Sequence, residues 1–588
     1  PLYGVEISLK SRQGTIHSRR LDIGLRTITV RREPDQWGES FEFVVNGLPV
    51  FARGADYIPE DVALTRGGRE RTERLILDSV RANFNCLRVW GGGVYPGEDF
   101  WQLCDRHGLI VWMDLMYACA LYDISHPPLR ETMLAEVRDN LLRIRHHASL
   151  GLVCGNNEME QAFVDWNLPQ EPRLKTEYLL QYQHLFPAIA QEVCPEVYYW
   201  PASPSSGGDF DQPYAPDRGD CHFWEVWHGN KDYSEFTKHY FRFMSEFGFE
   251  SFPAMKTIES FTLPADRNPF SPVMEDHQRC VGGNGKIMNY VSRYFRYPTS
   301  FAGVVQVSQI SQAEVLRHGI EHWWRNRGRC MGSVYWQLND NWSVASWSSI
   351  DYFGRWKALH YEARRAYAPL LVSTVSPDPE SLDPAIRVTL RLPEGNGHFR
   401  PQPAIVDLHL SNESREAAAG TLVWELLDMA GAVLEKGSLP VSTPAFTSSS
   451  QARLDFSARV NGLDRPRNCL FCWHAVLENG LDLHGFHAFV PYKQLELGTA
   501  RIEARVVEMT VDGSPGLAIE LNADRPALFA TVDHRDLDLV LSDNCIPLDG
   551  HTSRRLVVVE CRREGRAVQV SAAELAGGLT VTSLADTY

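Results

Sequence analysis

Long hydrophobic runs and excess positive charge are both missing from this chain. No stretch approaches the roughly 18 uninterrupted apolar residues that a membrane-spanning helix needs. Lys and Arg number 58 against 74 Asp and Glu, which gives a formal net charge of −16. Such a balance is not typical of a protein that binds nucleic-acid phosphates or anionic lipid. We therefore expect no nucleic-acid partner and no membrane.

Paired cysteines at metal-ligand spacing are also lacking. The 12 Cys are scattered singly, except for Cys469 and Cys472 within one strand-like run. Two residues three apart on a strand point to opposite faces, so we predict buried thiols and no metal site there. Scattered cysteines favour a reducing compartment such as the cytoplasm. The first residue is Pro, so we infer that the true N-terminus lies upstream and that the compartment stays open.

No glycine-rich phosphate loop is present. The run Gly91-Gly92-Gly93 follows a strand candidate but lacks the dinucleotide-binding pattern, which disfavours a nucleotide-dependent enzyme. The adjacent His146 and His147 are predicted to lie on the surface, because neighbouring helix-end positions do not easily face one metal. We expect no cofactor.

The pattern of short apolar strands and helical segments predicts several domains, since 588 residues are too many for one hydrophobic core. Between residues 36 and 370, strand candidates alternate with helical runs, as in a (β/α)8 TIM barrel. The eight candidates are Pro49–Ala55, Cys86–Trp90, Leu109–Asp114, Gly151–Gly155, Val197–Ala202, Cys221–Val226, Phe243–Glu246 and Cys330–Gln337.

The flanking regions read as all-β. Residues 371–495 and 496–588 contain alternating runs separated by Gly, Pro, Ser and Asn, which predicts two immunoglobulin-like β-sandwiches. Residues 1–35 hold only two or three loose strands, too few to bury a face. We interpret them as the remnant of an N-terminal β-sandwich, so that the upstream N-terminal domain of the same gene product is missing from this chain.

Two carboxylates stand where barrel strands end. Glu158 follows the fourth strand candidate and Glu246 ends the seventh. Active sites of such barrels form at the C-terminal ends of the strands, and glycoside hydrolysis needs two facing carboxyl groups. Either Glu alone is equally consistent with a structural ion pair. Both together favour catalysis, and the 16 Trp residues suit a sugar ligand as well as a packed core.

Five segments make the pattern more specific: NGLPVFARGADYIPED (46–61), LRVWGGGVYPGEDFWQLCDRHGLIVWMDLMYACALY (87–122), GNNE (155–158), MSEFGFESFP (244–253) and VYWQLNDNWSVASWSSIDYFGRWKALHYEARRAYAPL (334–370). They resemble the barrel of glycoside hydrolase family 2, in its β-mannosidase branch. The resemblance implies a retaining exo-β-glycosidase that hydrolyses terminal non-reducing β-D-mannosyl residues. It implies Glu158 as acid/base and Glu246 as nucleophile.

The resemblance also implies substrate-binding roles. Asn157 is expected to bind the sugar 2-hydroxyl, Arg88 to hold Glu246 ionised, and Trp336 to form the floor beneath the sugar. Trp90 and Trp224 are candidates for the pocket wall, each with packing as its alternative. His222 and Tyr335 are further candidates at strand ends.

One departure from the family pattern keeps a second substrate open. The branch usually has Gly-Ala-Asn-Trp-Ile-Pro where this chain has Gly-Ala-Asp56-Tyr-Ile-Pro. A negative charge at Asp56 would favour an amino sugar, so exo-β-D-glucosaminidase is the alternative activity. A non-catalytic carbohydrate-binding or scaffold protein is the alternative of another class.

Overall fold

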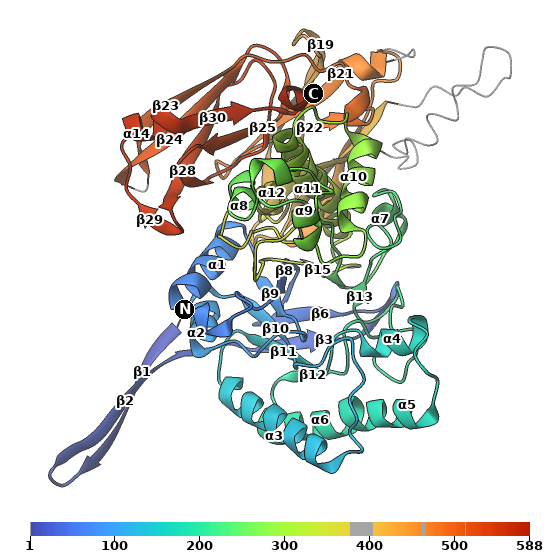
Figure 1. Cartoon of the computed structure of the whole chain (residues 1–588), viewed down its shortest axis with the longest axis vertical. Helices are drawn as coiled ribbons and strands as arrows, with labels where there is room; N and C mark the ends of the chain where they lie inside the picture. Colours follow the sequence, from blue (N-terminus) through green and yellow to red (C-terminus); the bar gives the residue numbers. More distant parts are fainter. Residues whose placement is uncertain (1, 377–403, 461–464, 512) are drawn as a thin grey trace. The chain divides into compact units, whose positions relative to one another are not determined.

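The computed structural model describes residues 2–376, 404–460, 465–511 and 513–588 (Figure 1). The chain divides into two compact units, which we call the barrel unit and the C-terminal unit. The barrel unit comprises Pro1–Trp224, His239–Gly248 and Asn326–Asn341, and the C-terminal unit comprises Glu225–Lys238, Phe249–Arg325 and Trp342–Tyr588.

The barrel unit is built on one parallel sheet of eight strands. Its order is β12-β11-β10-β9-β8-β15-β14-β13, which is the neighbour order of a (β/α)8 barrel and confirms that fold class. The strands are β8 (Ala52–Tyr57), β9 (Cys86–Val89), β10 (Ile110–Asp114), β11 (Leu150–Cys154), β12 (Tyr198–Trp200), β13 (Cys221–His222), β14 (Met244–Glu246) and β15 (Gly332–Tyr335). Between β12 and β13, Trp200 Nε1 and Ser205 N donate to Asp220 at 2.7 and 3.0 Å.

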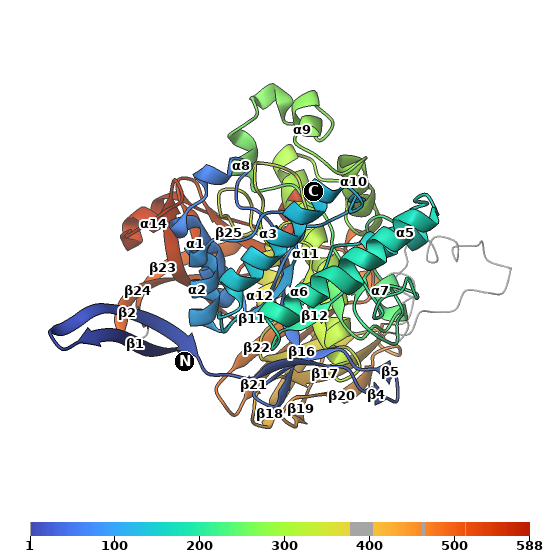
Figure 2. The same cartoon turned by 90° about the horizontal axis from the view of Figure 1, so that it is seen from below.

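Helices connect the first five strands of this sheet. They are α1 (Arg69–Arg81), α2 (Glu98–His107), α3 (Pro127–Ile144), α4 (Met159–Asp165), α5 (Pro172–Leu179) and α6 (Phe186–Val193). The apolar face of α3 buries Val137, Leu141 and Ile144, as its sequence period predicts. Helices α3 and α6 pack side by side (Figure 2).

A small sheet supplies aromatic rings to the barrel core. It contains β3 (Ile28–Arg31), β6 (Glu42–Val45) and β7 (Leu48–Val50), and the short pair β4 (Pro34–Asp35) and β5 (Gly38–Glu39) lies between β3 and β6 in sequence. Phe41 and Phe43 pack there with Trp112 and Phe243 in one buried cluster.

The first two strands form a hairpin that projects from the barrel (Figure 1). They are β1 (Leu2–Ser11) and β2 (Gly14–Gly24). One face carries the exposed side chains of Tyr3, Ile7 and Leu9. The interpretation of residues 1–35 as a sandwich remnant stays a prediction.

The C-terminal unit begins with helices and continues as two β-sandwiches. Its helices are α7 (Glu235–Lys238), α8 (Met255–Glu259), α9 (Pro272–Asp276), α10 (Gly283–Tyr294), α11 (Phe301–Arg325), α12 (Ala358–Ala366) and α14 (Ala572–Gly578). Among the described helices, none is long and apolar enough to cross a membrane.

Each sandwich has its own core. The first packs β16 (Leu370–Val375), β17 (Ile405–Asn412) and β20 (Thr447–Asp455) against β18 (Ala418–Asp428), β19 (Val433–Thr443), β21 (Cys469–Leu477) and β22 (Asp482–Ala488). The second contains β23 (Ile502–Val511), β24 (Ser514–Ala523), β25 (Ala527–His534), β26 (Asp538–Leu541), β27 (Ile546–Leu548), β28 (Arg554–Arg563), β29 (Arg566–Val568) and β30 (Leu579–Thr582).

Candidate active site

Strand alternation places a layer of charged side chains above the apolar core of the barrel. Cys86 and Trp112 belong to the buried inner cluster, and two residues later on the same strands stand Arg88 and Asp114. Because alternate residues of a strand share a face, both charged side chains point inward at the C-terminal ends of β9 and β10. Asp56 reaches the same layer from β8.

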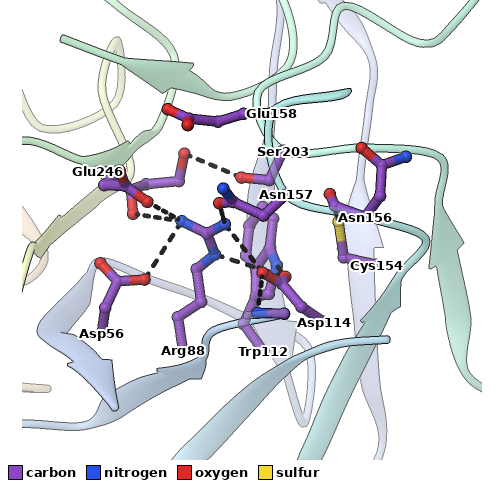
Figure 3. Close-up of polar contacts among 12 residues, drawn as sticks. Asp56, Arg88, Trp112, Asp114, Cys154, Asn156, Asn157, Glu158, Ser203 and Glu246 are labelled. Carbon is purple, nitrogen blue, oxygen red and sulfur yellow. Dashed lines mark hydrogen bonds and ion pairs between the residues drawn. The ribbon is translucent and has the colours of Figure 1, made fainter. Parts of the chain in front are cut away.

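The Arg88 guanidinium is the centre of this layer and is fully buried (Figure 3). It binds Glu246 Oε2 and Asp114 Oδ2 at 2.9 Å each, Asn157 Oδ1 at 2.5 Å and Asp56 Oδ1 at 3.2 Å. Burial by itself would lower the pKa of Arg88, but the neighbouring carboxylates raise it well above its ordinary value. Arg88 is therefore a fixed cation that binds Glu246 directly.

Glu158 and Glu246 face each other across the site. One carboxylate oxygen of each, together with a ring nitrogen of His222, all lie within 4.8 Å of one another. His222 Nδ1 is 2.9 Å from Glu158 Oε1 and 3.7 Å from Glu246 Oε1. Trp224 Nε1 donates to Glu246 Oε1 at 3.2 Å. The two carboxyl groups thus share a small space but have different partners.

Those partners give the two carboxyl groups different ionisation. Burial raises the pKa of Glu158, and the charge of Arg88 and bonds from Cys119 and Asn157 oppose this only in part. Burial also raises the pKa of Glu246, against the opposing effects of His222 and Arg88. Only Glu246 holds a direct ion pair, so we expect it to ionise first and Glu158 to keep its proton longer.

His222 is a neutral side chain between these groups. Burial lowers its pKa to about 4. Nε2 lies 3.2 Å from Arg88 Nη1 and 3.0 Å from Ser203 Oγ. Because Arg88 has only donors, we assign the acceptor role to Nε2 and the single ring proton to Nδ1. The ring therefore donates from Nδ1 to Glu158.

The backbone at Glu158 is held in an unusual conformation. Its φ of 64° lies in the left-handed region, just before α4 begins. Glu158 N donates to Ser203 O at 2.7 Å, and Asn157 N donates to Tyr117 O at 2.9 Å. Such strained conformations persist where neighbouring structure fixes them, and they cluster at functional sites.

Half-buried indole rings border the charged layer. The rings of Trp90 and Trp336 meet edge to face with centroids 4.9 Å apart. Trp224 is also half-buried and contacts Glu246 through its N–H. Tyr335 is different: it neighbours the inward Val334 on β15, so alternation turns it outward, where its buried ring lies 6.0 Å from that of Phe84. Its placement indicates packing rather than the substrate contact expected from its strand end.

Asp56 also departs from the expectation of a charge at the mouth of the barrel. Its side chain is fully buried, and burial raises its pKa well above the ordinary value even beside Arg88. Arg88 approaches Asp56 Oδ1 at 3.2 Å without the alignment of a hydrogen bond, whereas Asp114 accepts hydrogen bonds from Arg88, Trp112 and Gly91. We therefore assign the proton to Asp56 and the charge to Asp114.

Two contributors were not found from the sequence. Asp114 ends the third strand candidate, so the same strand-end rule that selected Glu158 applies to it equally. Cys119 lies in a loop, with its sulfur 3.6 Å from Glu158 Oε2 and 3.5 Å from Asn157 Nδ2. No spacing signal pointed to this cysteine.

Glu158, His222 and Glu246 also offer a donor set that fits a metal ion. An ion there would compete with existing partners for the Glu246 carboxylate, because Oε2 accepts a hydrogen bond from Arg88 and Oε1 accepts one from Trp224. It would also face the buried positive charge of Arg88. These hydrogen bonds and the charge of Arg88 therefore favour a proton-transfer role for the two carboxyl groups over metal binding.

Comparison with known proteins gives consistent matches along the chain. Residues 404–494 match the family described as Mannosidase Ig/CBM-like domain, and residues 499–587 match an Ig-fold domain family. Beta-mannosidase B of Emericella nidulans is 37% identical over 385 residues, which cover 63% of this chain and 45% of that protein. Beta-mannosidase B of Neosartorya fischeri matches with the same identity and coverage. The chain thus spans about half the length of these curated relatives.

The solved structures agree in fold. The beta-D-mannosidase of Dictyoglomus thermophilum superposes with a TM-score of 0.85 at 28% identity, covering 99% of this chain and 66% of that chain. An exo-chitosanase of Amycolatopsis orientalis superposes with a TM-score of 0.70, covering 99% and 68%, but its 15% identity supports the fold alone. Together with the sequence matches and the mannosidase sandwich domains, these findings show that the chain is similar to the β-mannosidases of glycoside hydrolase family 2.

Proposed function

We propose that this chain is a retaining exo-β-glycosidase that hydrolyses terminal non-reducing β-D-mannosyl residues. The observation that carries the proposal is the pair of facing carboxyl groups, with oxygens of Glu158 and Glu246 within 4.8 Å. Retaining enzymes place their two carboxyl groups about 5–5.5 Å apart, whereas inverting enzymes leave about 6.5–9.5 Å for a water molecule. The short separation supports double displacement.

The ionisation of the pair assigns the two roles. Glu246, ion-paired with Arg88, attacks the anomeric carbon while Glu158 donates its proton to the departing oxygen. This forms an ester between Glu246 and the sugar and releases the aglycone as an alcohol. Glu158, now ionised, takes a proton from water as that water attacks the anomeric carbon, which frees Glu246 and restores the starting configuration.

The substrate assignment rests on the relatives, which are named as beta-mannosidases. The glucosaminidase alternative depended on a free negative charge at Asp56. That carboxyl group is fully buried beside Arg88, so its position does not favour recognition of an amino group. The binding-protein alternative is disfavoured because both carboxyl groups and their partners are in place.

A panel of nitrophenyl β-glycosides tests this proposal. We expect cleavage of the mannoside ahead of the glucosaminide, galactoside and glucuronide, and loss of that cleavage in Glu158→Ala and Glu246→Ala. Glu171→Ala, which removes an exposed carboxylate, serves as the matched control. A preference for the glucosaminide would move the substrate to the alternative, and folded protein that cleaves none of the four would contradict the proposal.

A further inference from the structure

Two histidines and an aspartate meet on a face of the first sandwich that borders the second sandwich, far in sequence from the catalytic residues. His474 on β21 lies directly opposite His484 on β22 in the antiparallel register. Asp482 stands two residues before His484, so its side chain leaves the same face of β22. Since β22 is the edge strand of its four-stranded sheet, this cluster ties an edge strand to its neighbour.

The side chains of the cluster converge on one point. His474 Nε2 and His484 Nε2 lie 2.5 and 2.7 Å from the same Asp482 oxygen, Oδ1. The two imidazole rings stack with centroids 4.2 Å apart and planes 5° apart. Both rings therefore present the same nitrogen to the same place, an arrangement that the continuous β21–β22 ladder holds in register.

A cavity opens beside these rings. Its volume is about 410 Å³, and its lining includes both histidines together with Glu425, Cys472, Asp549, His551 and Arg554. A space of this size admits water molecules to an ion.

We propose that His474, Asp482 and His484 form a binding site for a divalent transition-metal ion of the Zn²⁺ class. Imidazole nitrogens with one carboxylate oxygen suit Zn²⁺ and its neighbours better than Mg²⁺ or Ca²⁺, which prefer oxygen ligands. In a tetrahedral zinc site the ligand atoms lie about 3.3 Å apart, since each bond is about 2.0–2.1 Å. The half-exposed Asp482 side chain needs to move by less than about 1 Å to meet that spacing.

Such an ion would cross-link the edge strand β22 to its neighbour β21. Its three protein ligands come from one hairpin, and its remaining coordination positions face the cavity. The proposal is independent of the glycosidase function, because the site lies in the sandwich and uses none of the residues around Arg88.

Isothermal titration of the full chain with ZnCl2 and with MgCl2, after treatment with a chelator, tests the site. We expect one equivalent of Zn²⁺ to bind and Mg²⁺ not to compete, with a rise in the thermal unfolding temperature on zinc binding. His474→Ala and His484→Ala should each weaken zinc binding by at least about tenfold. Asp482→Asn, which keeps size and polarity, should also weaken it. His17→Ala removes an exposed histidine of the N-terminal hairpin and should change nothing.

Circular dichroism of the metal-free variants keeps the test independent of folding. If His474→Ala is unfolded without metal, His474→Gln replaces it. Zinc binding of unchanged affinity in the His474→Ala/His484→Ala double variant would assign the ion to another cluster and overturn the proposal. Absence of zinc binding to the wild-type chain would overturn it as well.

Discussion

At the scale of single residues, the site is organised by one buried cation among several acids. Arg88 contacts Asp56, Asp114 and Glu246, so one positive charge is shared by three carboxyl groups. Placing the proton on Asp56 leaves Arg88 paired with Asp114 and Glu246. This balance keeps Glu246 ionised in a buried setting, which is the state that a nucleophile requires.

Protonated Glu158 is the acid in the first step, so activity should fall as pH rises through its raised pKa. Because Nδ1 of His222 donates to Glu158 and stabilises its ionised form, His222→Phe should raise the Glu158 pKa further. We expect the alkaline limb of the kcat/KM profile to move to higher pH in this variant. The measurement is the pH dependence of mannoside cleavage by the two proteins.

An alkaline limb that stays in place, or that moves to lower pH, would contradict the assigned donor role of His222. The acid limb follows ionisation of Glu246 and should also move to higher pH, because His222 lowers the pKa of that carboxyl group as well.

At the scale of elements, close packing of the first barrel strands positions the charged layer. Gly54 on β8 pairs with Cys86 on β9, and a Cβ atom at Gly54 would lie 1.8 Å from the Cys86 carbonyl oxygen. Only the absence of a side chain lets these strands approach here. The same two strands carry Asp56 and Arg88 two residues later.

Gly54→Ala should therefore destabilise the fold by about 1–3 kcal/mol or more, as overpacked core sites do. Gly97→Ala is the control, because a Cβ at Gly97 meets nothing within 4 Å and its φ is −69°. Chemical denaturation of both variants measures the difference. Equal denaturation midpoints for Gly54→Ala and the wild type would contradict this, because they would show that β8 and β9 can move apart without loss of folding free energy.

The sequence allowed prediction of elements better than of side-chain directions. Apolar runs bounded by turns located all eight barrel strands, and the strand-end rule selected Glu158 and Glu246, which the structure brings together. The same rule selected Tyr335, which alternation turns outward. A strand end thus indicates a position along the barrel but not the face on which the side chain lies.

Contacts between distant segments explain the remaining differences. His147 was expected on the surface, yet it is 3% exposed, because Asp105 on α2 binds its Nδ1 at 2.7 Å. Cys119 reaches Glu158 from a loop 39 residues away in sequence. Neither partner is visible in local periodicity or in composition.

At the scale of the whole molecule, the last sandwich is integral to the C-terminal unit. Tyr361 on α12 belongs to the hydrophobic core of this sandwich. Arg355 Nε pairs with Asp538 at 2.8 Å, and Arg562 donates to Gly354 O at 3.0 Å. The last sandwich therefore packs on apolar surface of the segment around α12 and is not connected to it by a flexible linker alone.

Removal of residues 499–588 should expose that surface and lower the thermal stability of the rest of the chain. We expect the shortened protein to unfold at a lower temperature and to aggregate at concentrations where the full chain does not. Differential scanning fluorimetry and light scattering measure both effects. An unchanged unfolding temperature would show that the last sandwich is an independent module.

In the proposed mechanism, Glu246 forms a covalent bond to the sugar, and Glu158 acts as the general acid and then as the general base. The most direct measurement uses a 2-deoxy-2-fluoro-β-mannosyl fluoride, which slows breakdown of a glycosyl-enzyme, followed by mass spectrometry of the digested protein. We predict one added fluoromannosyl group, on the peptide that contains Glu246, and none in Glu246→Ala. Label on another carboxylate, or turnover without any label, would contradict the account.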